Sequence, residues 1–220
     1  MIVSLPFNEA DWQRAERLLD CCYWLAGKKL DYHLLLVADS AIHAEFKTKV
    51  KIAAEVAFQS VELIEAVVAP DAAKTVAINT AFRTACQYIS QSYRHPWLWL
   101  EADCVPLAAG WLKELFRIYD KQPKRFMGRH LKANSGTFMS RVGVYPQNAY
   151  RDLEGALKGA PPFERVANIL PGCQNTQLIH MEKWTAASNI PSAAVLLNGD
   201  RTGALIENVI EGAQPKKRAA

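Results

Sequence analysis

Two acidic residues, Glu101 and Asp103, follow an apolar and aromatic run at residues 97–100. Side chains two residues apart on an extended segment point to the same side, so the two carboxylates can share one cation. Oxygen ligands suit hard cations such as Mn²⁺ or Mg²⁺. The apolar run predicts a buried strand, at whose end unpaired carboxylates are costly without a cation or hydrogen-bond donors. The pair therefore predicts a divalent-metal site that suits a diphosphate; the alternative is a plain turn before Pro106.

The elements that would position this pair alternate along the first 107 residues. We predict strands at 2–5, 32–38, 61–68 and 97–100, and helices at 12–26, 46–57, 78–89 and 111–119. Pro6 is expected to end the first strand, and Asp11 to cap the first helix. This alternation is typical of an α/β fold with an open, mostly parallel sheet flanked by helices.

The sequence becomes irregular after about residue 108, where strands at 125–128 and 136–145 are expected among loops that contain Pro and Gly. We predict one domain over residues 1–212, with halves at 1–107 and 108–212, and a basic tail at 213–220. The alternative is a domain boundary near residue 108, which would leave about 110 residues on each side.

The composition is that of an ordinary globular protein. Half of the 220 residues are apolar, and 26 basic against 22 acidic residues give a mild net charge of +4. Five cysteines without a C-x-x-C pair indicate neither a disulfide framework nor a zinc site. Without an apolar run of about 20 residues or a secretory start, we expect a cytoplasmic protein with no membrane partner.

Two segments resemble the GT-A glycosyltransferases. Residues 99–107, followed by Gly110, Trp111 and Leu112, are similar to the strand, D-x-D-like turn and helix start of that family's metal-binding segment. Residues 194–206 resemble the H-G-x-K-D-G-x-L-I segment of small, often phage-encoded members. The resemblance implies a GT-A (Rossmann-like) fold with a nucleotide-binding half at 1–107 and an acceptor-side half at 108–212, in the cytoplasm of a bacterium or a phage-infected host.

The same resemblance implies a metal centre. Asp103 would be the stronger ligand of Mn²⁺ or Mg²⁺, and Glu101 the weaker or water-mediated one. Asn198 stands where the family has His, and Arg201 where it has Lys. An amide oxygen can bind a hard cation, and Arg can neutralise phosphate. His180 is a rival third ligand.

Further residues are candidates for binding a nucleotide sugar. Pro6 and Asn8 follow the first strand and Asp39 follows the second, where this fold receives the base and the ribose; turn formation or capping is the alternative. Lys74 and Asn79 stand at the start of the third predicted helix, where a phosphate or donor sugar would be favoured, or where a surface lysine and a capping Asn would suffice.

An inverting transfer needs a base to take a proton from the acceptor hydroxyl. Glu164 resembles the acid that this fold places at a helix start on the acceptor side, and Asp152 and Glu154 compete with it. A retaining transfer needs no such base.

Positive charge is interleaved with aromatic residues in the second half. The basic residues are Arg125, Arg129, His130, Lys132 and Arg141. Such a pattern can form a groove for a polyanion or a solvated sheet face. Because small phage-type relatives include enzymes that glycosylate modified DNA bases, the resemblance makes DNA a candidate acceptor.

The sequence therefore favours a metal-dependent glycosyltransferase that moves a sugar from a nucleoside diphosphate, with UDP as the first candidate, to a hydroxyl acceptor. A non-catalytic nucleotide- or glycan-binding protein on a degenerate GT-A scaffold is one alternative. A nucleotidyltransferase is another, although no Gly-rich phosphate loop follows the first predicted strand.

Overall fold

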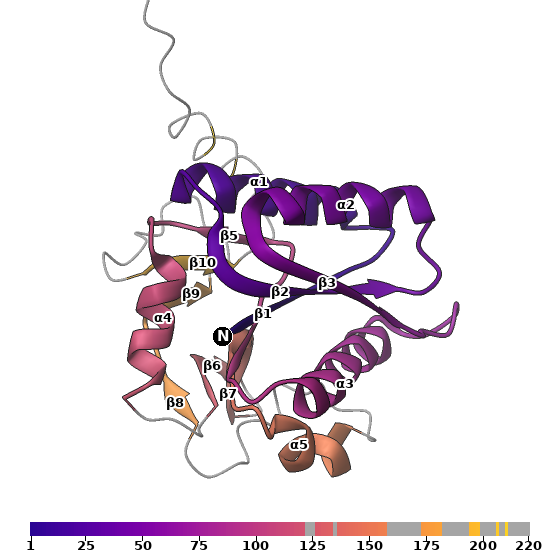
Figure 1. Ribbon diagram of the computed structural model, residues 1–220. Helices are drawn as coiled ribbons and strands as arrows, with labels where there is room; N and C mark the ends of the chain where they lie inside the picture. Colours follow the sequence, from indigo (N-terminus) through magenta and orange to yellow (C-terminus); the bar gives the residue numbers. More distant parts are fainter. Residues whose placement is uncertain are drawn as a thin grey trace, which may run out of the picture.

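A seven-stranded sheet forms the centre of the molecule in the computed structural model, which describes residues 1–121, 126–133, 136–157, 173–181, 194–198, 206 and 210 (Figure 1). In sheet order, its strands are β3 (Phe58–Ala66), β2 (Leu30–Asp39), β1 (Ile2–Phe7), β4 (Trp97–Trp99), β7 (Gly136–Tyr145), β6 (Met127–Ala133) and β8 (Gln174–Asn175). Strands β3, β2, β1 and β4 are parallel, and β7 runs antiparallel to both β4 and β6. The predicted α/β fold with a mostly parallel sheet is confirmed.

Five helices cover the two faces of this sheet in the described part of the chain. They are α1 (Trp12–Ala26), α2 (Ala44–Ala57), α3 (Lys74–Ser92), α4 (Trp111–Tyr119) and α5 (Ala149–Leu157). Helices α1 and α2 lie on one side of the sheet, and α3 and α5 lie on the other (Figure 1). Helices α1, α2 and α4 contribute to one cluster of buried apolar side chains, and α3 and α5 contribute to another. The central strands supply residues to both clusters, as expected for a sheet that is buried on both faces.

A second, three-stranded sheet joins residues 196–198 to the predicted metal segment. Its strands are β5 (Cys104–Pro106), β10 (Leu196–Asn198) and β9 (Ile179–Met181), with β10 in the middle. The antiparallel register of β10 and β5 sets Asn198 opposite Cys104. This pairing brings two segments almost a hundred residues apart to the same place.

The helices and the strands of the first half follow the predicted elements closely, whereas β6 extends to Ala133 and the short strands β5, β8, β9 and β10 were not predicted. Helix α4 has the predicted bounds, and α1 ends where Gly27 adopts the left-handed conformation with φ 66°. Strand β1, however, continues through Pro6, which we expected to end it. Strand β4 pairs only with Ile2–Ser4, so β1 has no neighbour on that edge at Pro6. Proline, which lacks an N–H, therefore costs the sheet no hydrogen bond at this position.

Both halves of the chain contribute to the large sheet, since β4 lies beside β7. The predicted domain limits at residues 107 and 212 stay predictions, and the basic tail lies outside the described residues. None of the helices that the structure describes combines the length and the apolar character needed to cross a membrane.

Candidate functional site

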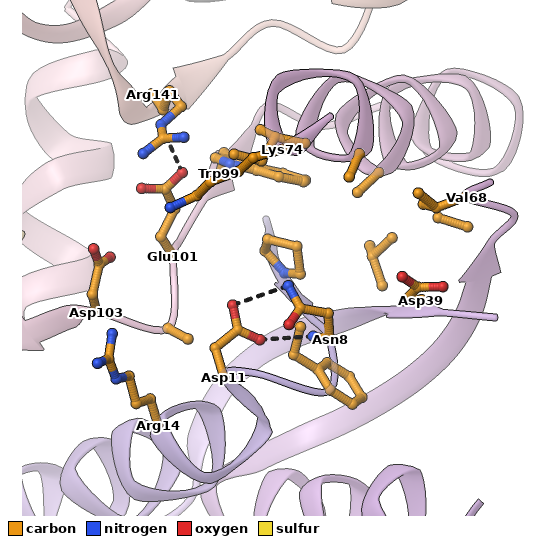
Figure 2. Close-up of a pocket in the computed structure, with 18 residues that line it drawn as sticks. Asn8, Asp11, Arg14, Asp39, Val68, Lys74, Trp99, Glu101, Asp103 and Arg141 are labelled. Carbon is orange, nitrogen blue, oxygen red and sulfur yellow. Dashed lines mark hydrogen bonds and ion pairs between the residues drawn. The ribbon is translucent and has the colours of Figure 1, made fainter. Parts of the chain in front are cut away.

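A pocket of about 990 Å³, a volume that includes its open mouth, lies at the carboxyl ends of β1, β2 and β4 (Figure 2). Ligands commonly bind at this edge of an open α/β sheet. The pocket is lined by residues from the loop after β1, the first turns of α1 and α3, the segment after β4, and β7. The predicted site residues Pro6, Asn8, Asp39, Lys74, Glu101 and Asp103 all line it.

The first end of the pocket, which we call the Asn8 end, combines polar and apolar side chains. Asn8 and Asp39 lie here, at the ends of β1 and β2, with Val68 near Asp39 (Figure 2). Val37 also lines the pocket. Asn8 is held firmly, because its Oδ1 accepts a hydrogen bond from the Ala10 N–H at 2.7 Å. This end therefore offers a flat ring both apolar contact and hydrogen-bonding groups.

Asp11 lies in the middle of the pocket and does not cap α1 as the sequence suggested. Its side chain makes no capping bond and turns back instead, accepting hydrogen bonds from the Asn8 N–H at 2.7 Å and from Asn8 Nδ2 at 3.4 Å. Burial raises the pKa of Asp11 above its ordinary value, and the nearby charge of Asp103 adds to this effect. The loop after β1 thus places a third carboxylate close to the predicted pair.

The second end, which we call the acidic end, brings Glu101, Asp103 and Asn198 together. Asn198 Nδ2 lies 2.7 Å from Asp103 Oδ1, 3.5 Å from Glu101 Oε2 and 3.2 Å from Cys104 Sγ. The Asn198 side chain has its place because β10 pairs with β5, and the residue is only 3 % exposed. Two carboxylates and one amide therefore converge on one point.

Cations from three elements surround these carboxylates. Arg14 of α1 points toward Asp103, Lys74 begins α3, and Arg141 of β7 forms an ion pair with Glu101, Nε to Oε1, at 3.0 Å (Figure 2). The four carboxylates in the lining, those of Asp11, Asp39, Glu101 and Asp103, exceed these three cations by one. A divalent cation would reverse that balance and leave a net positive pocket for an anionic ligand.

The donor set at the acidic end fits a hard divalent cation. The carboxylates of Glu101 and Asp103 already face a common group, and a half-turn of the Asn198 amide would present its oxygen to the same point. Within the described ranges, no three His, Cys, Asp or Glu side chains form a group that could hold a metal. The third protein ligand in such a site would therefore be the Asn198 amide.

Several other predicted residues lie away from this site. Asn79 is buried in α3 and does not line the pocket. His180 lies opposite Leu197 in the β9–β10 pair, so it shares the face of Leu197 and points away from the face that carries Asn198. Asp152 is exposed on α5, where it bonds to Asn148 and Arg151, and it is absent from the lining. Glu164 and Arg201 lie outside the described residues.

Comparison with solved structures identifies the architecture. The galactosyltransferase LgtC, solved with donor and acceptor sugar analogues, superposes with a TM-score of 0.65 over 99 % of this chain and 98 % of its own. The fold is that of the GT-A glycosyltransferases. Glycosyltransferase GlyE of Streptococcus pneumoniae TIGR4 gives a TM-score of 0.62 over 98 % of this chain and 61 % of its own. The bifunctional glycosyltransferase WbbM gives 0.58 over 90 % and 45 %.

Sequence identity to these three proteins is only 9 %, 10 % and 12 % respectively, so the GT-A likeness concerns the fold. No protein-family model matches the sequence, and no curated protein matches it. The GT-A architecture expected from residues 99–107 and 194–206 is confirmed. The comparisons give no support to the expected likeness to phage-encoded members.

Proposed function

We propose that this protein is a glycosyltransferase that moves a sugar from a nucleoside diphosphate, with UDP as the first candidate, to a hydroxyl acceptor. The observation that carries the proposal is the convergence of Glu101, Asp103 and Asn198 at one end of a pocket in a GT-A fold. The similar structures LgtC, GlyE and WbbM are those of glycosyltransferases, which agrees with this chemistry.

In the proposed complex the nucleoside occupies the Asn8 end and the diphosphate extends toward the acidic end. Val37 and Val68 pack against the base, while Asn8 and Asp39 bind polar atoms of the base or ribose. Lys74, at the first turn of α3, faces the same space and adds positive charge near the diphosphate. The chain's own contribution is thus to fix the donor at both ends and to shape the space between.

The metal in this proposal is Mn²⁺ or Mg²⁺, held by Asp103, Glu101 and the amide oxygen of Asn198. When bound, it would supply the positive charge that stabilises the departing diphosphate. Asp103 is the principal ligand in this proposal, and Asn198, whose Nδ2 lies 2.7 Å from Asp103 Oδ1, can turn from donor to co-ligand. His180 is not part of this site, since it faces away from Asn198.

Glu164 stays a prediction for the base, whereas Asp152 is not proposed because it lies on the exposed side of α5, outside the pocket lining. Arg141, one of the basic residues of the groove expected for DNA, lines the pocket instead. We therefore propose a hydroxyl acceptor without assigning its class. An electrophoretic shift assay at low salt tests whether DNA is the acceptor, and the absence of a shift would rule DNA out.

A non-catalytic nucleotide-binding protein is the second candidate. The observation that favours it is the amide of Asn198, which donates to both carboxylates where the family has a His ligand. Hydrolysis of the donor in the absence of an acceptor distinguishes a catalyst from a binder. Among the described residues, nothing favours a nucleotidyltransferase.

The test of the proposal is calorimetry of the full chain with UDP and UDP-sugars, with Mn²⁺ and with a chelator. We expect the nucleotide to bind only with Mn²⁺, and we expect Asp103→Asn to weaken this binding at least about 100-fold. Removing a group that merely hydrogen-bonds to a metal ligand already costs about 10- to 100-fold in metal affinity. Asp120→Asn, an exposed acid at the end of α4, is the matched control and should bind as the wild type does. Equal binding by Asp103→Asn and wild type would refute the site.

A further inference from the structure

The ion pair between Arg141 and Glu101 occupies one of the two carboxylates that the metal would need. Arg141 Nε lies 3.0 Å from Glu101 Oε1, and the side chains are 32 % and 13 % exposed. Glu101 Oε2 points the other way, toward Asn198 Nδ2 at 3.5 Å. In the free protein, Glu101 is therefore held between a guanidinium and an amide.

Arg141 also has a special place in the fold. Among the lining residues that the structure describes, it is the one that comes from the second half of the chain, on β7, while the others lie between Pro6 and Asp103. Strand β7 runs beside β4, so the guanidinium reaches the acidic end from the side opposite Arg14 (Figure 2). From this position Arg141 can contact both Glu101 and an anion in the pocket.

We propose that Arg141 guards Glu101 against a divalent cation and releases it when a nucleoside diphosphate enters, so that metal and nucleotide bind cooperatively. The inference rests on the proposed function, because it takes Glu101 as a metal ligand and a diphosphate as the pocket's anion. The new element is Arg141, which couples the binding of the metal to that of the diphosphate.

The physical basis is a competition of charges at Glu101. A cation bound to this carboxylate would lie within a few ångströms of the Arg141 guanidinium, and the two positive charges would repel each other in a partly buried site. A diphosphate offers the guanidinium an alternative anionic partner of suitable geometry. Arg141 can then leave Glu101 without losing a charge partner, and Glu101 becomes free to bind the cation. Linkage requires the cation to favour diphosphate binding equally.

The experiment measures the affinity of the full chain for Mn²⁺, by the paramagnetic resonance signal of free Mn²⁺, without UDP and at saturating UDP. The complex of Mn²⁺ with UDP in solution is the same for all variants and is measured separately. Arg141→Gln keeps a polar side chain but removes the charge. We expect it to bind Mn²⁺ alone about tenfold more tightly, and the gain in Mn²⁺ affinity caused by UDP to fall at least about fivefold.

Three further variants control for general effects and for failure of Arg141→Gln to fold. Arg129→Gln removes an arginine from the neighbouring strand β6, outside the pocket lining, and should behave as the wild type does. Arg141→Lys keeps the charge and should keep the weak binding of Mn²⁺ alone. If Arg141→Gln does not fold, Arg141→Ala replaces it and is compared with Arg141→Lys. Equal Mn²⁺ affinities of these two variants would overturn the proposed role of Arg141.

The outcomes separate this inference from the proposed function. One outcome is that UDP binds, but Arg141→Gln has the same Mn²⁺ affinity as Arg129→Gln, both without UDP and at saturating UDP. The role of Arg141 is then overturned while the proposed function stands. If the wild-type chain binds no UDP at any Mn²⁺ concentration, both are overturned. Tighter binding of Mn²⁺ alone by Arg141→Gln, with a smaller gain from UDP, supports the inference.

Discussion

The Asp11 carboxylate lies between the two ends of the pocket, with both oxygens directed at Asn8. Burial is the main cause that raises its pKa above 3.8, and the charge of Asp103 raises it further. The folded protein therefore disfavours the ionised form of Asp11. A carboxylate that lowers stability in this way is typical of a site shaped for a ligand.

Asp11→Asn should become more stable relative to wild type as the pH rises. Below about pH 3.8 the carboxyl is protonated in folded and unfolded chains alike, so its ionisation costs nothing. As the pH rises through the folded-state pKa, the wild type loses stability by ionising a buried group, and the amide of the variant does not. Urea unfolding at pH 4 and pH 7 measures the difference. Asp31→Asn, at an exposed position on β2, is the control, and an unchanged difference for Asp11→Asn would contradict the expectation.

At the residue scale, the sequence predicted side chains that directly follow strands and missed those reached only through packing. Glu101 and Asp103 come after β4, and Asn8 and Asp39 end β1 and β2, so their place follows from strand order alone. For Arg141 the sequence indicates only a pattern of basic residues interleaved with aromatic ones, because it does not tell which face of β7 points to the pocket. Arg14 carried no signal except its position one turn after Asp11.

At the element scale, two neighbouring strands of the second half, β6 and β7, approach each other closely. Gly128 of β6 and Gly143 of β7 lie opposite each other. A Cβ on Gly143 would lie 2.7 Å from the Met127 carbonyl oxygen, and a Cβ on Gly128 would lie 2.5 Å from Met139 Cγ. The first obstacle is backbone, whereas the second is a flexible side chain. The two glycines are therefore needed to different degrees.

Gly143→Ala should destabilise the protein more than Gly128→Ala. Overpacking of this kind costs about 1–3 kcal/mol, and we expect the upper part of the range for Gly143, because the Met127 carbonyl cannot move without disturbing β6. Denaturant unfolding of both variants gives the ranking. Adding Met139→Ala should relieve Gly128→Ala in a double-mutant cycle and help Gly143→Ala much less. The reverse ranking would contradict the proposed obstacle.

The elements themselves were largely predictable, because helical and strand periodicity reflect which faces are buried. The helix predicted at 111–119 and the end of α1 at Gly27 agree with the structure. The error at Pro6 has a different origin: whether a proline ends a strand depends on whether its neighbour strand extends that far, and β4 is short. The pairing of β10 with β5, which positions Asn198, joins distant segments that local patterns cannot connect.

At the scale of the whole molecule, the GT-A architecture persists at identities of 9–12 % because it depends on layers and strand order more than on particular side chains. One aromatic cluster connects the parts. Phe82 of α3 packs against Trp97 and Trp99 of β4 and Tyr145 of β7, with ring centroids 5.0–5.3 Å apart. It therefore touches both halves of the predicted single domain.

Phe82→Ala should lower the free energy of unfolding by about 3–5 kcal/mol, since it empties a fully buried ring from this cluster. For a chain of this size that corresponds to a fall in Tm of about 6–20 °C. Because Phe82 contacts strands of both halves, calorimetry should show one transition that shifts as a unit. Val67→Ala, at a position 80 % exposed, is the control and should stay within about 0.5 kcal/mol of wild type. A split into two transitions, with only one displaced by Phe82→Ala, would show that residues 1–107 and 108–212 unfold independently and would contradict the single domain.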